Sequence, residues 1–86
     1  RLLTLARDLK RRKARERQGL FVAEGLRTVE ALLDSPLRVR GVLTSDVLDR
    51  TPRGAELLAR LNAAGLEQVR VSDAEFESAA DTEQPQ

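Results

Sequence analysis

Basic side chains crowd one stretch near the start of the chain, and their chemistry is the recognition of anions. Seven of the eight residues from position 10 to 17 are charged, and the basic ones are Lys10, Arg11, Arg12, Lys13, Arg15 and Arg17. An arginine guanidinium matches a phosphate with a planar fork and stacks on unpaired bases. Each phosphate that the stretch neutralises releases counterions, so binding should weaken steeply with salt. The stretch therefore indicates contact with a nucleic acid.

The overall charge conceals this concentration. The 86 residues include 15 basic and 14 acidic side chains, which gives a net charge of +1. Residues 1–17, here called the basic arm, hold eight basic and two acidic residues and carry +6, while the remainder carries −5. The separation of a basic arm from an acidic remainder gives information about binding partners and not about the fold. RNA is favoured over DNA because no helix-turn-helix spacing is present. The alternative is a solvated basic helix that serves solubility.

Several residue types that catalysis commonly uses are missing. The chain has no cysteine and no histidine, so it lacks thiolate metal ligands, disulfides and the commonest general base. Its serines have no histidine to activate them, its five glycines form no phosphate loop, and no metal site is expected. No apolar run approaches the roughly 20 residues that span a bilayer, so we expect a cytoplasmic protein with no membrane partner. These residues alone do not predict an enzyme.

A second candidate site follows a short apolar run at positions 20–23. Glu24 and Gly25 stand between this run and a helical pattern, and ligands gather where strands of open α/β sheets end. Glu24 could orient Arg15 or Arg27, or accept a hydrogen bond from a ribose hydroxyl. The alternative is a structural ion pair, or a carboxylate that favours the helix N-terminus. Gly25 is expected to serve backbone geometry.

Apolar spacing and capping signals predict alternating helices and strands. Thr51-Pro52 is typical of a helix start, Gly65 of a left-handed helix end, and Ser72 with Glu75 of a capping box. Alternation of such short elements implies parallel strands with crossover helices. We therefore expect an α/β fold, a small three-layer α/β/α sandwich. Its helices are expected at 2–13, 26–34, from Thr51 to near Gly65, and from Ser72 onward, and its strands at 20–23, 39–44 and 68–71.

Two segments together resemble a known family. Residues 13–25, KARERQGLFVAEG, are similar to the opening signature of SpoU/TrmH-type RNA 2′-O-ribose methyltransferases. Residues 78–86, SAADTEQPQ, resemble the hinge motif before the catalytic domain of that family. The chain departs from the hinge motif at Gln84, where threonine is usual, and in the Ala79-Ala80 pair that precedes the Asp-Thr-Glu. The resemblance extends over nearly the whole chain.

The resemblance implies a division of labour. Residues 1–80 would be the RNA substrate-binding domain, similar in fold to small ribosomal proteins that recognise RNA kink-turns, and 81–86 would begin the hinge. The expected catalytic domain, a knotted fold that binds S-adenosylmethionine and forms a homodimer, lies outside this chain. The complete enzyme would methylate a ribose 2′-hydroxyl in ribosomal or transfer RNA. This segment itself would hold no cofactor.

The resemblance also assigns individual residues. Arg15, Glu24 and Gly25 match the first motif, and Arg15 is expected to grip a phosphate while Glu24 holds it in place. The positions that match the hinge motif are Thr82, Pro85 and Gln86. Lys10 to Lys13, Arg17 and Arg27 would extend the basic surface. Two alternatives remain open at this point: a stand-alone interaction or ribosome-associated module, and a docking surface between domains of one enzyme.

Overall fold

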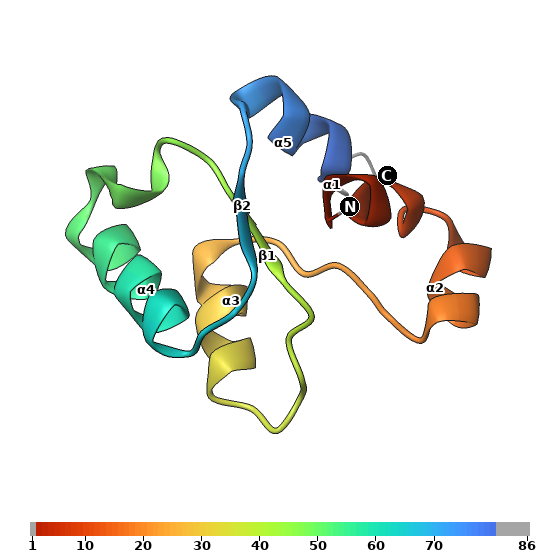
Figure 1. Ribbon diagram of the computed structural model, residues 1–86, viewed down its shortest axis with the longest axis horizontal. Helices are drawn as coiled ribbons and strands as arrows, with labels where there is room; N and C mark the ends of the chain where they lie inside the picture. Colours follow the sequence, from red (N-terminus) through yellow and green to blue (C-terminus); the bar gives the residue numbers. More distant parts are fainter. Residues whose placement is uncertain (1, 81–86) are drawn as a thin grey trace.

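Two parallel strands lie at the centre of the molecule, and helices flank them on both sides (Figure 1). The computed structural model describes residues 2–80. In Figure 1, α3 and α4 lie to one side of the strands, and α1 and α5 lie to the other. The elements in chain order are α1 (Leu2–Asp8), α2 (Arg12–Gln18), α3 (Leu26–Leu33), β1 (Val42–Thr44), the 3₁₀ helix η1 (Leu48–Arg50), α4 (Pro52–Ala63), β2 (Gln68–Arg70) and α5 (Asp73–Ala79).

The strands pair as the alternating pattern predicts. β1 and β2 run parallel with Leu43 opposite Val69, and α4 makes the crossover between them. The backbone N–H of Val71 donates to the carbonyl of Thr44 at 2.8 Å and extends the pairing beyond β2. A parallel connection requires such a crossover, because the chain must return to the end of the sheet at which the first strand began before the second strand can run in the same direction. The mixed α/β class is therefore confirmed.

The expected first strand, residues 20–23, is absent from the sheet. The segment belongs to the irregular connection between α2 and α3 (Figure 1), and the sheet within residues 2–80 has two strands. A short apolar run predicts burial and extension, but it does not specify a pairing partner. The prediction of a strand at these positions is wrong. The three-layer sandwich that depended on it remains a prediction.

The expected single helix over residues 2–13 bends into two. The N–H of Leu9 still donates to the carbonyl of Leu5 at 2.9 Å, but those of Lys10 and Arg11 reach only three residues back, to Arg7 and Asp8. Leu9 is the last residue of the apolar stripe and is buried. A straight helix would carry the following cations along the same axis, whereas the bend lets Leu9 enter the core and turns α2 outward. The prediction of one continuous helix is corrected accordingly.

The predicted helix ends are confirmed in detail. The N–H of Gly54 donates to Oγ1 of Thr51 at 3.0 Å, and Ser72 and Glu75 form both hydrogen bonds of a capping box. Gly65 has a φ of 69°, and the N–H of the following Leu66 donates to the carbonyl of Leu61 at 3.5 Å. This pattern is a Schellman motif. Local capping chemistry therefore fixes both ends of α4 and the start of α5.

The core draws on helices from both sides of the sheet. Its buried apolar residues are Leu2, Leu9, Ala14, Leu57, Leu61, Val71 and Ala79. α1 contacts both α5 and β1, and α4 packs closely on η1 at Gly54. A Cβ atom at Gly54 would lie 1.7 Å from the carbonyl oxygen of Leu48, so only glycine fits there. The packing of α1 on α5 anchors the start of the basic arm.

Candidate nucleic-acid interface

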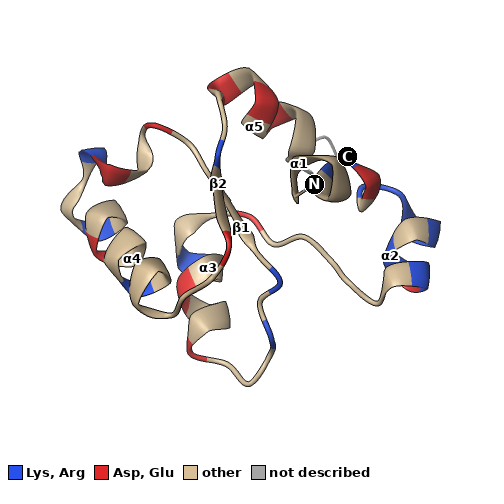
Figure 2. Cartoon of the chain, viewed as in Figure 1, with Lys and Arg blue, Asp and Glu red and all other residues tan. Residues whose placement is uncertain are grey.

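The described part of the basic arm turns its cations to solvent on α2. Figure 2 shows Lys and Arg gathered on this helix, whereas α3 and α4 carry charges of both signs. The side chain of Arg12 is 82% exposed, and Arg11, Lys13 and Arg17 are exposed as well. Ala14 is the buried residue of the helix and fixes it to the core. One small residue therefore packs α2 against the core, and the exposed cations of the helix are available to a partner.

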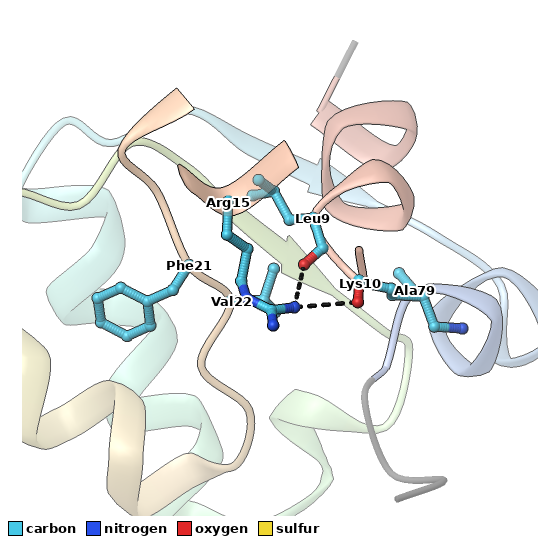
Figure 3. Close-up of a pocket in the computed structure, with 6 residues that line it drawn as sticks. All are labelled: Leu9, Lys10, Arg15, Phe21, Val22 and Ala79. Atoms are coloured by element: carbon cyan, nitrogen blue, oxygen red, sulfur yellow. Dashed lines mark hydrogen bonds between the residues drawn. The ribbon is translucent and has the colours of Figure 1, made fainter. Parts of the chain in front are cut away.

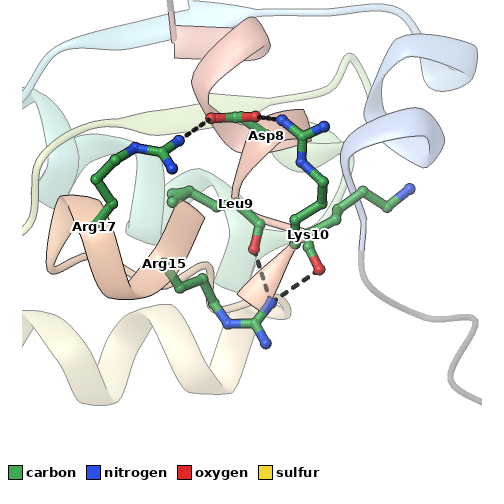
Figure 4. A network of polar contacts seen from close by, with 6 residues as sticks. Asp8, Leu9, Lys10, Arg15 and Arg17 are labelled. Carbon is green, nitrogen blue, oxygen red and sulfur yellow. Dashed lines mark hydrogen bonds and ion pairs between the residues drawn. The ribbon is translucent and has the colours of Figure 1, made fainter. Parts of the chain in front are cut away.

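Asp8 forms ion pairs with two arginines at the bend between α1 and α2 (Figure 4). Its carboxylate pairs with Arg11 and lies 3.9 Å from Nη2 of Arg17. On the opposite side of α2, Nε of Arg12 donates to Glu16 at 3.1 Å. Two carboxylates are thus shared among three arginines as ion-pair partners. Lys13 makes no ion pair with any residue from 2 to 80. The positive charge of the arm is only partly neutralised within the fold.

Arg15 is held by main-chain carbonyls. Its Nη1 donates to the carbonyl of Leu9 at 2.9 Å and to that of Lys10 at 3.0 Å (Figure 4). Both carbonyls follow the last turn of α1, where a cation satisfies oxygens that the helix leaves without partners. Nε and Nη2 of Arg15 make no hydrogen bond within the described residues. The Nη1 atom therefore holds the guanidinium in position, while Nε and Nη2 keep N–H groups that can donate to a partner.

The expected contact between Arg15 and Glu24 is not formed. No hydrogen bond or ion pair joins the two side chains in the part of the chain that the structure describes, and Glu24 is exposed. The bend after α1 directs Arg15 toward the end of that helix, so the backbone supplies the positioning that was expected of a carboxylate. The idea that Glu24 holds Arg15 in place is corrected by this geometry.

Two further cations attach the arm to α5. Nζ of Lys10 donates to the carbonyl of Ser78 at 2.9 Å, and Nε of Arg7 donates to its hydroxyl at 2.8 Å. Ser78 lies in the last turn of α5, where the helix dipole favours positive charge. Lys10 therefore has a structural contact as well as an exposed side chain. These two contacts therefore fix the basic arm to α5 near the end of α1.

The remaining predicted site residues are Gly25, Arg27 and the three positions of the hinge motif. Gly25 has a φ of 105° and a ψ of 147°, a conformation that glycine alone adopts readily, so its expected backbone role is confirmed. Arg27 lies in the first turn of α3, which Figure 1 shows apart from α2, and it makes no ion pair within residues 2–80. Thr82, Pro85 and Gln86 lie outside the described residues.

Arginines of the body pair with carboxylates from distant parts of the sequence. Arg53 binds Glu30 through two hydrogen bonds of 3.1 and 2.7 Å and connects α4 to α3. The hydrogen bond from Arg53 lowers the pKa of the Glu30 carboxyl, and the positive charges around it act in the same direction. Similar pairs join Arg60 to Asp34 and Arg70 to Asp46. No group of side chains able to hold a metal ion occurs among the described residues.

Phe21 is the candidate residue that sequence reasoning missed. It lies in the segment predicted to be a strand, but it is 61% exposed and lines a hollow together with Lys10 and Arg15 of the basic arm. It borders a hollow of about 150 Å³ whose lining consists of Leu9, Lys10, Arg15, Phe21, Val22 and Ala79. In the view of Figure 3, Phe21 lies on one side of Arg15, and Lys10 and Ala79 lie on the other. The available signal was an aromatic residue close to six cations in a chain with only two aromatics.

A second hollow lies along the bend, between α1 and α2. Its lining includes Thr4, Leu5, Arg7, Asp8, Lys10, Arg11 and Gln18. Six of its seven lining residues are charged or polar, and the Asp8 carboxylate among them is already paired with arginines. The two hollows share Lys10 and lie at the bend of the arm. The exposed cations and the concave surface of the molecule therefore occur in the same region.

Comparison with known proteins agrees with the motifs. The chain matches the family model of the MRM3-like substrate binding domain over residues 4–86. No curated protein and no solved structure matches it. No helix of the described residues is long and apolar enough to cross a bilayer. Because the family match covers almost the entire chain, the protein belongs to the MRM3-like substrate-binding domain family of SpoU-type rRNA 2′-O-methyltransferases, as the two motifs predicted.

Proposed function

We propose that this domain binds structured RNA for a 2′-O-ribose methyltransferase and that the basic arm supplies its phosphate contacts. The observation that carries the proposal is the surplus of exposed cations on α2, where two carboxylates serve three arginines and Lys13 has no ion-pair partner within residues 2–80. Membership of a substrate-binding family supports an RNA partner. Ribosomal or transfer RNA is the proposed substrate class.

The cations of the arm would contribute in different ways. Arg15 is fixed by two carbonyls and presents Nε and Nη2, so it offers a preorganised contact to one phosphate. Lys13 would act as a mobile point charge. Arg11, Arg12 and Arg17 form exposed ion pairs, and such pairs contribute little to stability, so their exchange for phosphate contacts costs little. The arm therefore combines one fixed donor with several adaptable ones.

Methyl transfer itself would belong to a catalytic domain outside residues 1–86. We propose that such a domain binds S-adenosylmethionine and brings two copies together, while the present chain binds RNA without a cofactor. Residues 81–86 would begin the connection to it. The two hydrogen bonds from the arm to Ser78 support this arrangement, because they join the RNA-contacting cations to the helix that immediately precedes that connection.

The proposal is tested by fluorescence anisotropy with a labelled, structured RNA. A variant with Arg11→Gln, Arg12→Gln and Lys13→Gln lowers the net charge by three, and we expect it to lose on the order of tenfold or more in affinity. The matched control carries Ala31→Glu, Ala55→Glu and Ala63→Glu, three exposed positions on α3 and α4 that lower the net charge equally. We expect this control to bind nearly as the parent does.

Two results would contradict the proposal. Equal losses in the variant and the control would mean that overall charge, and not the arm, governs binding. The absence of binding by the parent at low salt would mean that the arm serves a protein contact. The second outcome would favour a docking surface between domains, which the existing contact of Arg7 and Lys10 with α5 makes a specific alternative.

A further inference from the structure

We infer that Phe21 is a stacking platform for an unpaired nucleobase of the bound RNA. This inference rests on the proposed function and specifies which part of an RNA the site takes: a nucleotide in a loop, bulge or end, and not one within a duplex. The starting observation is that Phe21 is 61% exposed, although an aromatic side chain normally gains stability from burial.

The surroundings of Phe21 fit a base and its phosphate together. Leu9, Val22 and Ala79 give the adjoining hollow an apolar lining, while Lys10 and Arg15 supply positive charge at the same hollow. An unpaired nucleotide has the same division, with an apolar base face and an anionic phosphate. Base stacking on aromatic side chains next to a basic surface is a general means of binding single-stranded nucleic acid.

Charge distinguishes this occupant from a protein segment. The hollow contains two cations and no carboxylate among its lining residues, and the exposed cations of α2 lie nearby in the sequence. An apolar protein segment would gain nothing from these charges and would have to desolvate them. A nucleotide uses both the charged and the apolar parts of the site. The available donors of Arg15 provide a fixed direction for the phosphate.

The chain permits a direct spectroscopic test because it contains no tryptophan and no tyrosine. A Phe21→Trp variant would carry a single indole, whose emission is quenched when a nucleobase stacks on it. The control is Val47→Trp, at a position that is 45% exposed, lies between β1 and η1, and lines neither hollow. Both variants are titrated with an RNA hairpin that has an unpaired loop and with a fully paired duplex. Binding is followed in parallel by anisotropy.

We expect the hairpin to quench the emission of Phe21→Trp, the duplex to leave it nearly unchanged, and Val47→Trp to respond to neither RNA. Phe21→Ala should weaken hairpin binding about tenfold, and Phe21→Leu should not restore it, because an aliphatic side chain gives no stacking face. Since Phe21 is largely exposed, these substitutions should leave thermal unfolding close to that of the parent.

The inference fails separately from the proposed function. If anisotropy reports hairpin binding while the emission of Phe21→Trp stays as constant as that of Val47→Trp, RNA binds but Phe21 is not its stacking platform. Equal quenching by hairpin and duplex would also overturn the inference, because paired bases are not available to stack. If the unmodified chain binds neither RNA, the proposed function itself is lost and this inference with it.

Discussion

Arginines are used in opposite ways in the body of the domain and in the basic arm. In the body, Arg53, Arg60 and Arg70 each pair with a carboxylate more than 20 positions away, so these pairs connect separate elements. In the arm, Arg11 and Arg12 pair with carboxylates three and four positions away. Such local pairs orient side chains but join no distant elements.

The difference separates the charges that support the fold from those that are available to a partner. Removing cations from α2 should leave the packing of the body intact, because Ala14 alone seats that helix in the core. Arg15 is the exception within the arm, since its hydrogen bonds join α2 to the end of α1. Substitutions in the two regions should therefore affect stability and RNA affinity in different proportions.

The largest expected effect on stability comes from the body. Gly54→Ala places a methyl group 1.7 Å from the carbonyl oxygen of Leu48, a backbone atom that cannot move without separating α4 from η1. We expect a loss of at least about 3 kcal/mol in the free energy of unfolding, measured by urea denaturation. RNA binding should fall only in proportion to the fraction that unfolds.

A second glycine provides the control. Gly19 ends α2 with a φ of 68°, and no atom lies within 4 Å of the position its Cβ would take. Gly19→Ala should therefore cost only the backbone strain, about 1 kcal/mol. Equal destabilisation by the two substitutions would show that α4 and η1 are not in close contact at Gly54.

The next largest effect is expected at Arg15, whose role in stability can be compared with that of Lys13 in the same arm. Arg15→Gln removes the hydrogen bonds to the carbonyls of Leu9 and Lys10 and also one phosphate contact. We expect a loss of about 1–2 kcal/mol in stability together with weaker RNA binding. Lys13→Gln removes the same charge at a residue that has no ion-pair partner within residues 2–80, so it should weaken RNA binding and leave the unfolding curve unchanged. Stability losses of equal size in both variants would contradict the structural role of Arg15.

A smaller effect, and one of opposite sign, is expected at Asp8. Asp8→Asn keeps the shape of the side chain but removes the charge that holds Arg11 and Arg17. RNA affinity at low salt should rise by a few-fold, because two more guanidinium groups become available to phosphate. Anisotropy titrations at low and high salt would measure this gain. A decrease in affinity would instead show that Asp8 positions the two arginines for binding.

The smallest effect concerns the ion pair between Glu30 and Arg53. The pKa of Glu30 is lowered in the folded state by the hydrogen bond from Arg53, so the carboxylate stabilises the fold above its unfolded pKa. This contribution is lost as the pH falls through the lowered folded pKa. The stability difference between the parent and Arg53→Gln should therefore be present at neutral pH and vanish in acid. Arg50→Gln, which removes no ion pair within residues 2–80, should show no such trend.

The sequence predicted those parts of the fold that depend on neighbouring residues. The caps at Thr51, Ser72 and Gly65 form as expected, because each depends on hydrogen bonds within a few positions. The two motifs likewise identified the family, since they are contiguous in the sequence. The basic arm was located from charge alone. Its cations lie mostly on the surface, as charged side chains do by default, so their exposure could be predicted without knowledge of the packing.

The remaining features depend on contacts that no local pattern specifies. The segment at 20–23 has the composition of a strand but pairs with neither β1 nor β2, so Phe21 is exposed. The bend at Leu9 follows from where that side chain is buried, and it determines that Arg15 meets carbonyls and not Glu24. The clash that restricts position 54 to glycine arises from the packing of η1 on α4. Each of these requires the three-dimensional arrangement.

The salt dependence of RNA binding is the most direct test of the central claim that the basic arm grips phosphates. For the parent chain, the logarithm of the association constant should fall linearly with the logarithm of salt concentration. The variant with Arg11→Gln, Arg12→Gln and Lys13→Gln should have a slope shallower by roughly two to three, because each of the three lost phosphate contacts removes about 0.7–0.9. The same slope in both proteins would contradict the claim and place the phosphate contacts elsewhere on the domain.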